Sequence, residues 1–227
     1  MNYQIDAPGS AIRTTVKLPA SKSISNRALI LNALSYSAYD VENLSDCDDT
    51  NLMVKALNSN DRDFNVGAAG TTMRFLTAFL SKVVGEWTIT GTERMKNRPI
   101  KVLVDALNAL GARIEYMEKE GYPPLRIFGS ALQGGEISLP GNVSSQYISA
   151  ILMIAPLTEN GVMLHLEGAI ISRPYIHITL QLMEQYGVRA SWTENTIKVL
   201  PQEYKPIRFT VESDWSCLLY TSPSPRD

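Results

Sequence analysis

Apolar positions along the chain follow the helix period in some stretches and the strand period in others, in an order that recurs. Residues 86–90 alternate as a strand does, and Arg98-Pro99 then opens a stretch with helical spacing that stops at Gly111. Two further strands are predicted at 113–116 and 125–128. The apolar positions of the predicted helix are Ile100, Leu103, Val104, Leu107 and Leu110.

The same order of elements returns later in the chain. A strand at 162–167 leads through Arg173-Pro174 into a helix that stops at Gly187, and strands at 188–192 and 197–200 follow. A fixed order of strand, helix and two strands that occurs twice indicates an internal structural repeat.

A second kind of helix precedes each of these strands. The stretches 71–81 and 145–156 are apolar nearly all round, and 21–34 has the same character after a polar start. Helices of this kind are buried inside a domain, whereas 49–58 has the amphipathic pattern of an outer helix. We therefore predict an α/β fold of three repeated units of about seventy residues, with buried parallel helices surrounded by sheets and outer helices.

Composition limits the classes of partner. The 227 residues are 44% hydrophobic and 19% charged, with a net charge of only −2. A chain this close to neutral attracts neither nucleic acid nor an anionic membrane through its overall field, so we expect neither as a partner and expect any anion site to be local.

Cysteine and histidine positions predict no metal site or disulfide framework. Cys47 and Cys217 lie far apart, and neither shares a zinc-ligand spacing with His165 or His177. The first residues lack the pattern of a signal peptide and no apolar stretch has the length of a membrane span, so we expect a cytoplasmic protein. Residues 217–227, rich in serine and proline, are interpreted as a non-native tail.

Small hydroxyl residues mark the starts of all the predicted buried helices: Ser21-Lys22-Ser23, Gly70-Thr71-Thr72 and Ser144-Ser145-Gln146. The simplest interpretation of each is an ordinary helix cap, but free N–H groups and hydroxyls at helix starts also bind phosphate and carboxylate. Arg27 and Arg74 fall in the first turns of these helices, where a buried cation needs a carboxylate or a bound anion. The spacing alone predicts a site for more than one anion.

Five ordered stretches carry a resemblance to a known family: LPASKSISNRALIL, GAAGTTMRFL, GTERMKNRPI, GNVSSQYISAILM and SRPYIHITLQLM. They span Leu18 to Met183 and resemble the enolpyruvyl transferases, specifically the 5-enolpyruvylshikimate-3-phosphate synthases. One departure is Phe75, where many members have a proline. The resemblance implies transfer of the enolpyruvyl group of phosphoenolpyruvate to the 5-hydroxyl of shikimate 3-phosphate with release of phosphate, by a monomer that uses no metal or organic cofactor.

The same resemblance implies roles for residues at the matched positions. The residues expected to hold shikimate 3-phosphate are Lys22, Ser23, Arg27, Ser144, Ser145, Gln146, Ser172 and Tyr175. Those expected to face phosphoenolpyruvate are Lys22, Gly70, Arg98 and Gln146. Among them, Lys22 is expected to take part in catalysis, as a point charge beside both substrates.

Family topology also divides the chain. Residues 16–208 are expected to form the domain that binds shikimate 3-phosphate, whereas 1–15 and 209–216 are expected to belong to a second domain that supplies the acid and base carboxylates. These 227 residues are then expected to bind without turnover. The alternatives are a relative of the UDP-N-acetylglucosamine enolpyruvyl transferases, against which Ser23 and the Ser144-Ser145-Gln146 triplet argue, and a non-catalytic anion-binding module.

Overall fold

A computed structural model of the chain describes residue 15 and residues 17–214. The predictions made for 217–227, and for nearly all of 1–15, lie outside the described residues. No helix in the described part is long and apolar enough to cross a membrane.

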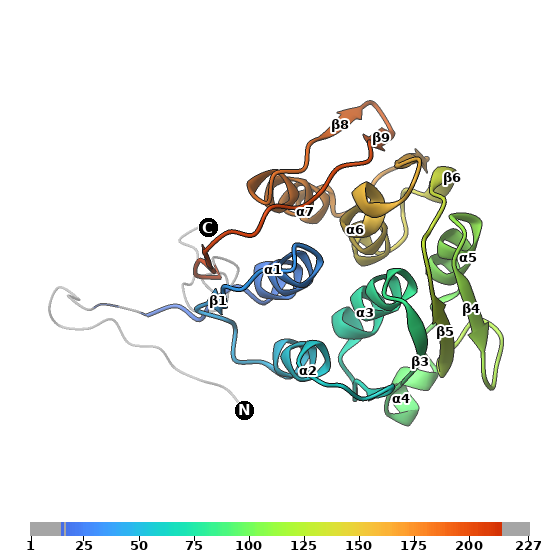
Figure 1. The fold of residues 1–227 in the computed structure, drawn as a ribbon, viewed down its shortest axis with the longest axis horizontal. Helices are drawn as coiled ribbons and strands as arrows, with labels where there is room; N and C mark the ends of the chain where they lie inside the picture. Colours follow the sequence, from blue (N-terminus) through green and yellow to red (C-terminus); the bar gives the residue numbers. More distant parts are fainter. Residues whose placement is uncertain (1–14, 16, 215–227) are drawn as a thin grey trace, which may run out of the picture.

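Three buried helices lie side by side at the centre of the fold (Figure 1). They are α1 (Lys22–Leu34), α3 (Gly70–Lys82) and α6 (Ser145–Ile154), which a short 3-10 turn, η1 (Ala155–Leu157), extends. Apolar side chains around most of their circumference pack into one large core, as the sequence pattern predicts. The expectation that the buried helices run side by side is confirmed.

Outer helices cover this centre. Helix α2 (Asp48–Leu57) packs on α1 and α3, and α7 (Arg173–Gln185) packs on α6 and α1. Helix α5 (Lys101–Ala109) follows the short helix α4 (Glu93–Lys96). The sequence pattern did not predict α4. Gly111 and Gly187 follow α5 and α7 with φ of 98° and 87°, a left-handed conformation that glycine adopts without strain and that ends a helix.

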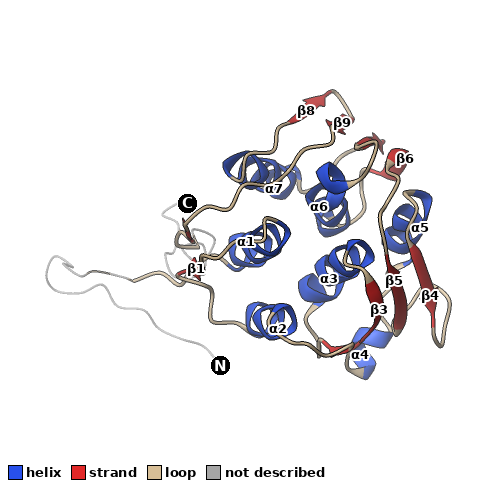
Figure 2. Ribbon diagram, viewed as in Figure 1, coloured by secondary structure: helices blue, strands red, loops and turns tan. Residues whose placement is uncertain are grey.

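Two four-stranded sheets repeat one topology (Figure 2). The first has the order β2 (Asp63–Asn65), β3 (Gly85–Thr90), β5 (Leu125–Gly129), β4 (Arg113–Tyr116). The second has the order β6 (Gly135–Pro140), β7 (Val162–Glu167), β9 (Thr196–Val199), β8 (Ala190–Thr193). In both sheets the first two strands of the order pair in parallel, and the other neighbouring strands pair antiparallel. The predicted repeat is therefore confirmed, although its edge strands β2 and β6 were not predicted.

The unit built on α1 and α2 differs from the other two. Between its helices lies only β1 (Val41–Glu42), which pairs in parallel with β10 (Phe209–Thr210). Within the described residues this unit therefore has a two-stranded sheet in place of a four-stranded one. Val211 packs with Ala28 and Val41 against α1. The predicted domain boundary at 208 stays a prediction.

Candidate functional site

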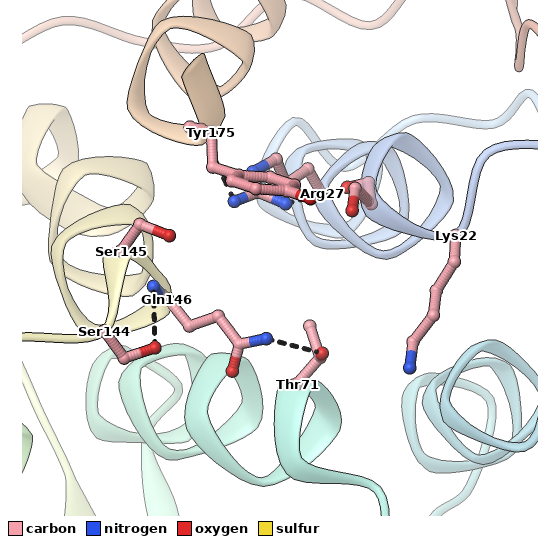
Figure 3. A pocket seen from close by; sticks show the side chains of 8 residues that line it. Lys22, Arg27, Thr71, Ser144, Ser145, Gln146 and Tyr175 are labelled. Atoms are coloured by element: carbon pink, nitrogen blue, oxygen red, sulfur yellow. Dashed lines mark hydrogen bonds between the residues drawn. The ribbon is translucent and has the colours of Figure 1, made fainter. Parts of the chain in front are cut away.

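The starts of α1, α3 and α6 surround a pocket of about 320 Å³, at the lower end of the size range of small-molecule sites (Figure 3). Lys22 and Gln146 extend toward Thr71 at the start of α3, and Tyr175 lies beside Arg27. Helix starts carry free N–H groups and partial positive charge, so their convergence favours an anion. The lining residues are Lys22, Ser23, Arg27, Thr71, Ser144, Ser145, Gln146 and Tyr175.

Arg27 is the most deeply buried charged group in the pocket wall, with only 2% of its surface exposed. Its Nε donates to Thr179 Oγ1 at 2.7 Å, and Nη2 donates to Ser149 Oγ at 2.9 Å and to the Tyr175 carbonyl at 3.5 Å. Its Nη1 donates to the Ser23 carbonyl at 2.9 Å. All these acceptors are neutral oxygens.

The charge of Arg27 is therefore left without a carboxylate partner among the described residues. Burial lowers the pKa of Arg27 to about 10, which still leaves the guanidinium charged at neutral pH. A buried cation with no counterion costs free energy that a bound anion recovers. The sequence pattern allowed two partners for Arg27, a carboxylate or a bound anion. The described residues supply no carboxylate for it.

Lys22 has a different environment. Its Nζ lies 2.9 Å from Asp49 Oδ2, and 44% of its side chain is exposed. Asp49 also accepts a hydrogen bond from the Thr71 N–H at 3.1 Å, and its carbonyl accepts one from Thr72 Oγ1 at 2.7 Å. Asp49 thus ties the starts of α1, α2 and α3 together. The sequence pattern placed Asp49 at the start of the outer helix 49–58 but gave no sign of its role in joining these helix starts.

Gln146 connects two of the helix starts. Its Nε2 donates to Thr71 Oγ1 at 3.0 Å, its Oε1 accepts a hydrogen bond from Arg74 Nη1, and its backbone N–H donates to Ser144 Oγ at 3.4 Å. Arg74 also stacks over Tyr147, 5.1 Å from the ring centroid. Thr71 lines the pocket but was not among the predicted binding residues, although it belongs to a hydroxyl helix start.

Gly70 and Arg98 lie beside the pocket and not in its wall. A Cβ atom built on Gly70 would come within 2.4 Å of Arg98 Nη1, so the space over this glycine is filled by the guanidinium. Burial lowers the pKa of Arg98, and the nearby positive charges of Arg74 and Arg94 lower it further. The negative charge of Asp49 acts on Arg98 in the opposite direction, and the net effect on its pKa is still a lowering.

The start of α7 contributes one of its two predicted residues to the pocket. Tyr175 lines it and is 43% exposed. Ser172 precedes the helix in a left-handed conformation with φ of 55°, makes no side-chain cap, and is not in the pocket wall. Nothing in the sequence indicated this backbone conformation.

Comparisons with known proteins agree with the motifs. A family model described as EPSP synthase (3-phosphoshikimate 1-carboxyvinyltransferase) matches residues 7–61 and 58–220. The chain is 59% identical over 221 residues to the 3-phosphoshikimate 1-carboxyvinyltransferase of Bacteroides fragilis strain YCH46, covering 97% of this chain and 54% of the relative. It is 42% identical over 242 residues to that of Vibrio campbellii, covering 94% and 57%.

The fold also matches solved structures. The EPSP synthase from Acinetobacter baumannii superposes with a TM-score of 0.78 at 21% identity, covering 88% of this chain and 50% of that chain. This likeness confirms the predicted fold class. The chain spans about half the length of the curated relatives it matches. The family model and the relatives carry the name of the shikimate enzyme, and the chain belongs to the EPSP synthase (3-phosphoshikimate 1-carboxyvinyltransferase) family.

Proposed function

We propose that the pocket between the starts of α1, α3 and α6 binds shikimate 3-phosphate. The observation that carries this proposal is Arg27, a fully buried guanidinium in the pocket wall whose protein partners are all neutral oxygens. A doubly charged phosphate supplies the missing counterion. In this assignment the substrate is held by the wall residues Lys22, Ser23, Arg27, Ser144, Ser145, Gln146 and Tyr175. The resemblance adds Ser172, which precedes α7 outside the wall.

Phosphoenolpyruvate takes the neighbouring subsite in this proposal, against Lys22, Gly70, Arg98 and Gln146. The like-charged arginines around Gly70 support this, because a carboxylate and a phosphate together relieve the repulsion between them. Gln146 contacts Thr71, the residue after Gly70, and so lies between the two subsites.

A protein of the relatives' full length would then join the two substrates. The 5-hydroxyl of shikimate 3-phosphate attacks C2 of phosphoenolpyruvate while C3 is protonated, and elimination of phosphate completes the transfer. Lys22 stabilises the negative charge that develops on the departing phosphate, and the helix starts hold the reacting groups in position. The proton transfers belong to carboxylates that the family carries outside this region, so these 227 residues bind without turnover. The monomeric state and cytoplasmic location stay predictions.

Calorimetry on the purified chain tests the binding proposal. Shikimate 3-phosphate is expected to bind with one site, and Arg27→Gln to weaken binding by at least about tenfold, as loss of a hydrogen bond to a charged group does. The matched control is Arg126→Gln, an exposed arginine on β5 that pairs with Glu86 at 3.6 Å; it should bind as the wild type does. If the wild type does not bind shikimate 3-phosphate, the proposal is wrong.

Two further ligands separate the alternatives. Equal affinity for shikimate 3-phosphate and inorganic phosphate would favour a general anion-binding module, and tighter binding of UDP-N-acetylglucosamine would favour the sugar-nucleotide enzyme. Turnover is followed by phosphate release in the presence of both proposed substrates. Sustained release by these 227 residues would contradict the claim that they bind only.

A further inference from the structure

Two buried hydroxyl groups lie directly behind Arg27. Ser149 on α6 and Thr179 on α7 are both fully buried, and their oxygens are 2.8 Å apart. Each accepts a hydrogen bond from the guanidinium, Thr179 from Nε at 2.7 Å and Ser149 from Nη2 at 2.9 Å. Neither residue lines the pocket, so neither contacts a ligand there.

The hydroxyl oxygens of this cluster keep lone pairs for Arg27. Thr179 Oγ1 donates to Ser149 Oγ at 2.8 Å, and the Tyr175 carbonyl oxygen, at 2.9 Å, is a second acceptor for the same single proton. Whichever acceptor takes that proton, the oxygens of Thr179 and Ser149 each keep a lone pair toward the guanidinium. Both hydroxyl groups thereby have hydrogen-bond partners within the core.

The donors of Arg27 are almost all used by this arrangement. A guanidinium has five N–H groups, and the bonds to Thr179, Ser149, Tyr175 and Ser23 take four of them. The remaining N–H is on Nη1, and Arg27 is part of the pocket wall. The Phe75 ring, with its centroid 5.3 Å from Cζ, adds a cation–π contact on one face. The guanidinium is therefore fixed in its plane with one donor left for a ligand.

The neutrality of these partners matters as much as their geometry. Lys22, the other cation of the pocket, lies 2.9 Å from a carboxylate oxygen of Asp49, which cancels much of its field. Hydroxyl oxygens orient Arg27 without cancelling its charge. A carboxylate in their place would hold the guanidinium equally well but would repel the anion.

From this arrangement we propose that Ser149 and Thr179 are positioning residues for anion binding, which fix the Arg27 guanidinium in orientation while leaving its positive charge for the ligand. The proposal rests on the proposed function for its ligand, shikimate 3-phosphate. It concerns residues that act through Arg27 and touch no substrate.

The test uses the 227-residue chain and the substitution Thr179→Val, which keeps the shape of the side chain and removes the acceptor. Thr179→Ser restores the hydroxyl. The matched control is Thr77→Val on α3, because Thr77 is also fully buried and its hydroxyl also bonds the carbonyl four residues earlier, at 2.7 Å, but it has no hydrogen bond to Arg27. Ser149→Ala provides a second removal of an acceptor, should Thr179→Val fail to fold.

Two readouts are measured, and Thr77→Val shows how far a merely structural defect moves each of them. The first is the side-chain Nε–H resonance of Arg27 in ¹H–¹⁵N spectra, assigned by its absence in Arg27→Lys. The second is the affinity for shikimate 3-phosphate by calorimetry. We expect Thr179→Val to shift the resonance and weaken binding by about tenfold or more, Thr179→Ser to recover both, and Thr77→Val to change neither.

The outcomes separate the two proposals. An unchanged resonance in Thr179→Val overturns the positioning role, as does a shifted resonance with unchanged affinity, or an equal loss of affinity in Thr77→Val. If the wild type does not bind shikimate 3-phosphate, the proposed function fails, and the positioning role for that ligand falls with it. The resonance then reports separately whether the hydroxyl groups hold the guanidinium.

Discussion

Replacing Gly70 with alanine measures how closely Arg98 packs on the start of α3. The added Cβ would lie 2.4 Å from Arg98 Nη1 and 2.8 Å from Cζ and Nη2, whereas unstrained contacts begin near about 3.5 Å. The guanidinium must therefore retreat by about 1 Å. It sits at the far end of a flexible side chain, so the expected cost is that of an off-rotamer torsion, roughly 0.5–1.5 kcal/mol.

A helical glycine replaced by alanine also gains stability. Gly70 is the first residue of α3 and does not have a left-handed φ, so alanine is compatible with its backbone and gains up to about 1 kcal/mol from the lower entropy of the unfolded chain. The two effects nearly cancel. We expect Gly70→Ala to change the free energy of unfolding by less than about 0.5 kcal/mol, within the usual range for substitutions without a core defect.

A double-mutant cycle with Arg98→Ala separates the two effects. Removing the Arg98 side chain removes the clash, so Gly70→Ala should stabilise the protein by about 0.5–1 kcal/mol in that background, which gives a coupling energy near 1 kcal/mol. Urea unfolding of the four proteins supplies the values. Identical effects of Gly70→Ala in both backgrounds, or a loss above about 2 kcal/mol in the wild type, would refute the reasoning.

Two other substitutions have sharply different expectations. In Gly129→Ala the new Cβ would lie 1.7 Å from the Val83 carbonyl oxygen and 2.4 Å from that of Leu80. Because these are backbone atoms that cannot move like a flexible side chain, we expect the free energy of unfolding, measured in urea, to fall by more than about 3 kcal/mol. A fall of less than about 1 kcal/mol would contradict this. Tyr204 donates to the Met153 carbonyl at 2.7 Å, and complete burial raises its pKa well above 10. Because the folded pKa exceeds the unfolded one, its contribution is full below pH 10 and is lost as the pH rises further. Tyr204→Phe should thus cost about 1 kcal/mol at pH 8 but lose less stability than the wild type between pH 8 and pH 10.5; parallel losses in the two proteins would show that Tyr204 does not titrate in this way.

Local sequence pattern was enough to predict most of the helices and strands. The buried helices are apolar nearly all round, and the outer helices stop at glycines with positive φ, so their type and approximate bounds follow from short-range chemistry. The edge strands β2 and β6 escaped prediction because β2 has only 3 residues and β6 begins at Gly135 and ends at Pro140, residues that normally interrupt strands.

The site was predictable in its residue types but not in its contacts. The hydroxyl helix starts and Arg27 were visible in the sequence, yet the partners of Arg27 lie 122 and 152 residues away, and no local pattern identifies them. Arg98 over Gly70 is a contact of the same kind, made between two segments that the sequence alone cannot place. Ser172 precedes α7 with a left-handed φ of 55°, which no local pattern predicts, and its role in binding stays a prediction.

The contacts of Arg27 also couple the opening of three helices. The guanidinium of Arg27 on α1 is hydrogen-bonded to Ser149 of α6 and to Thr179 of α7. None of these three helices can therefore separate from the others without breaking at least one of these hydrogen bonds. An anion at about a hundred times its dissociation constant would add roughly 2.7 kcal/mol against any opening that disrupts the site. Amide hydrogen exchange in α1, α6 and α7 should then slow together on ligand binding, and at amides far from the pocket as well as beside it.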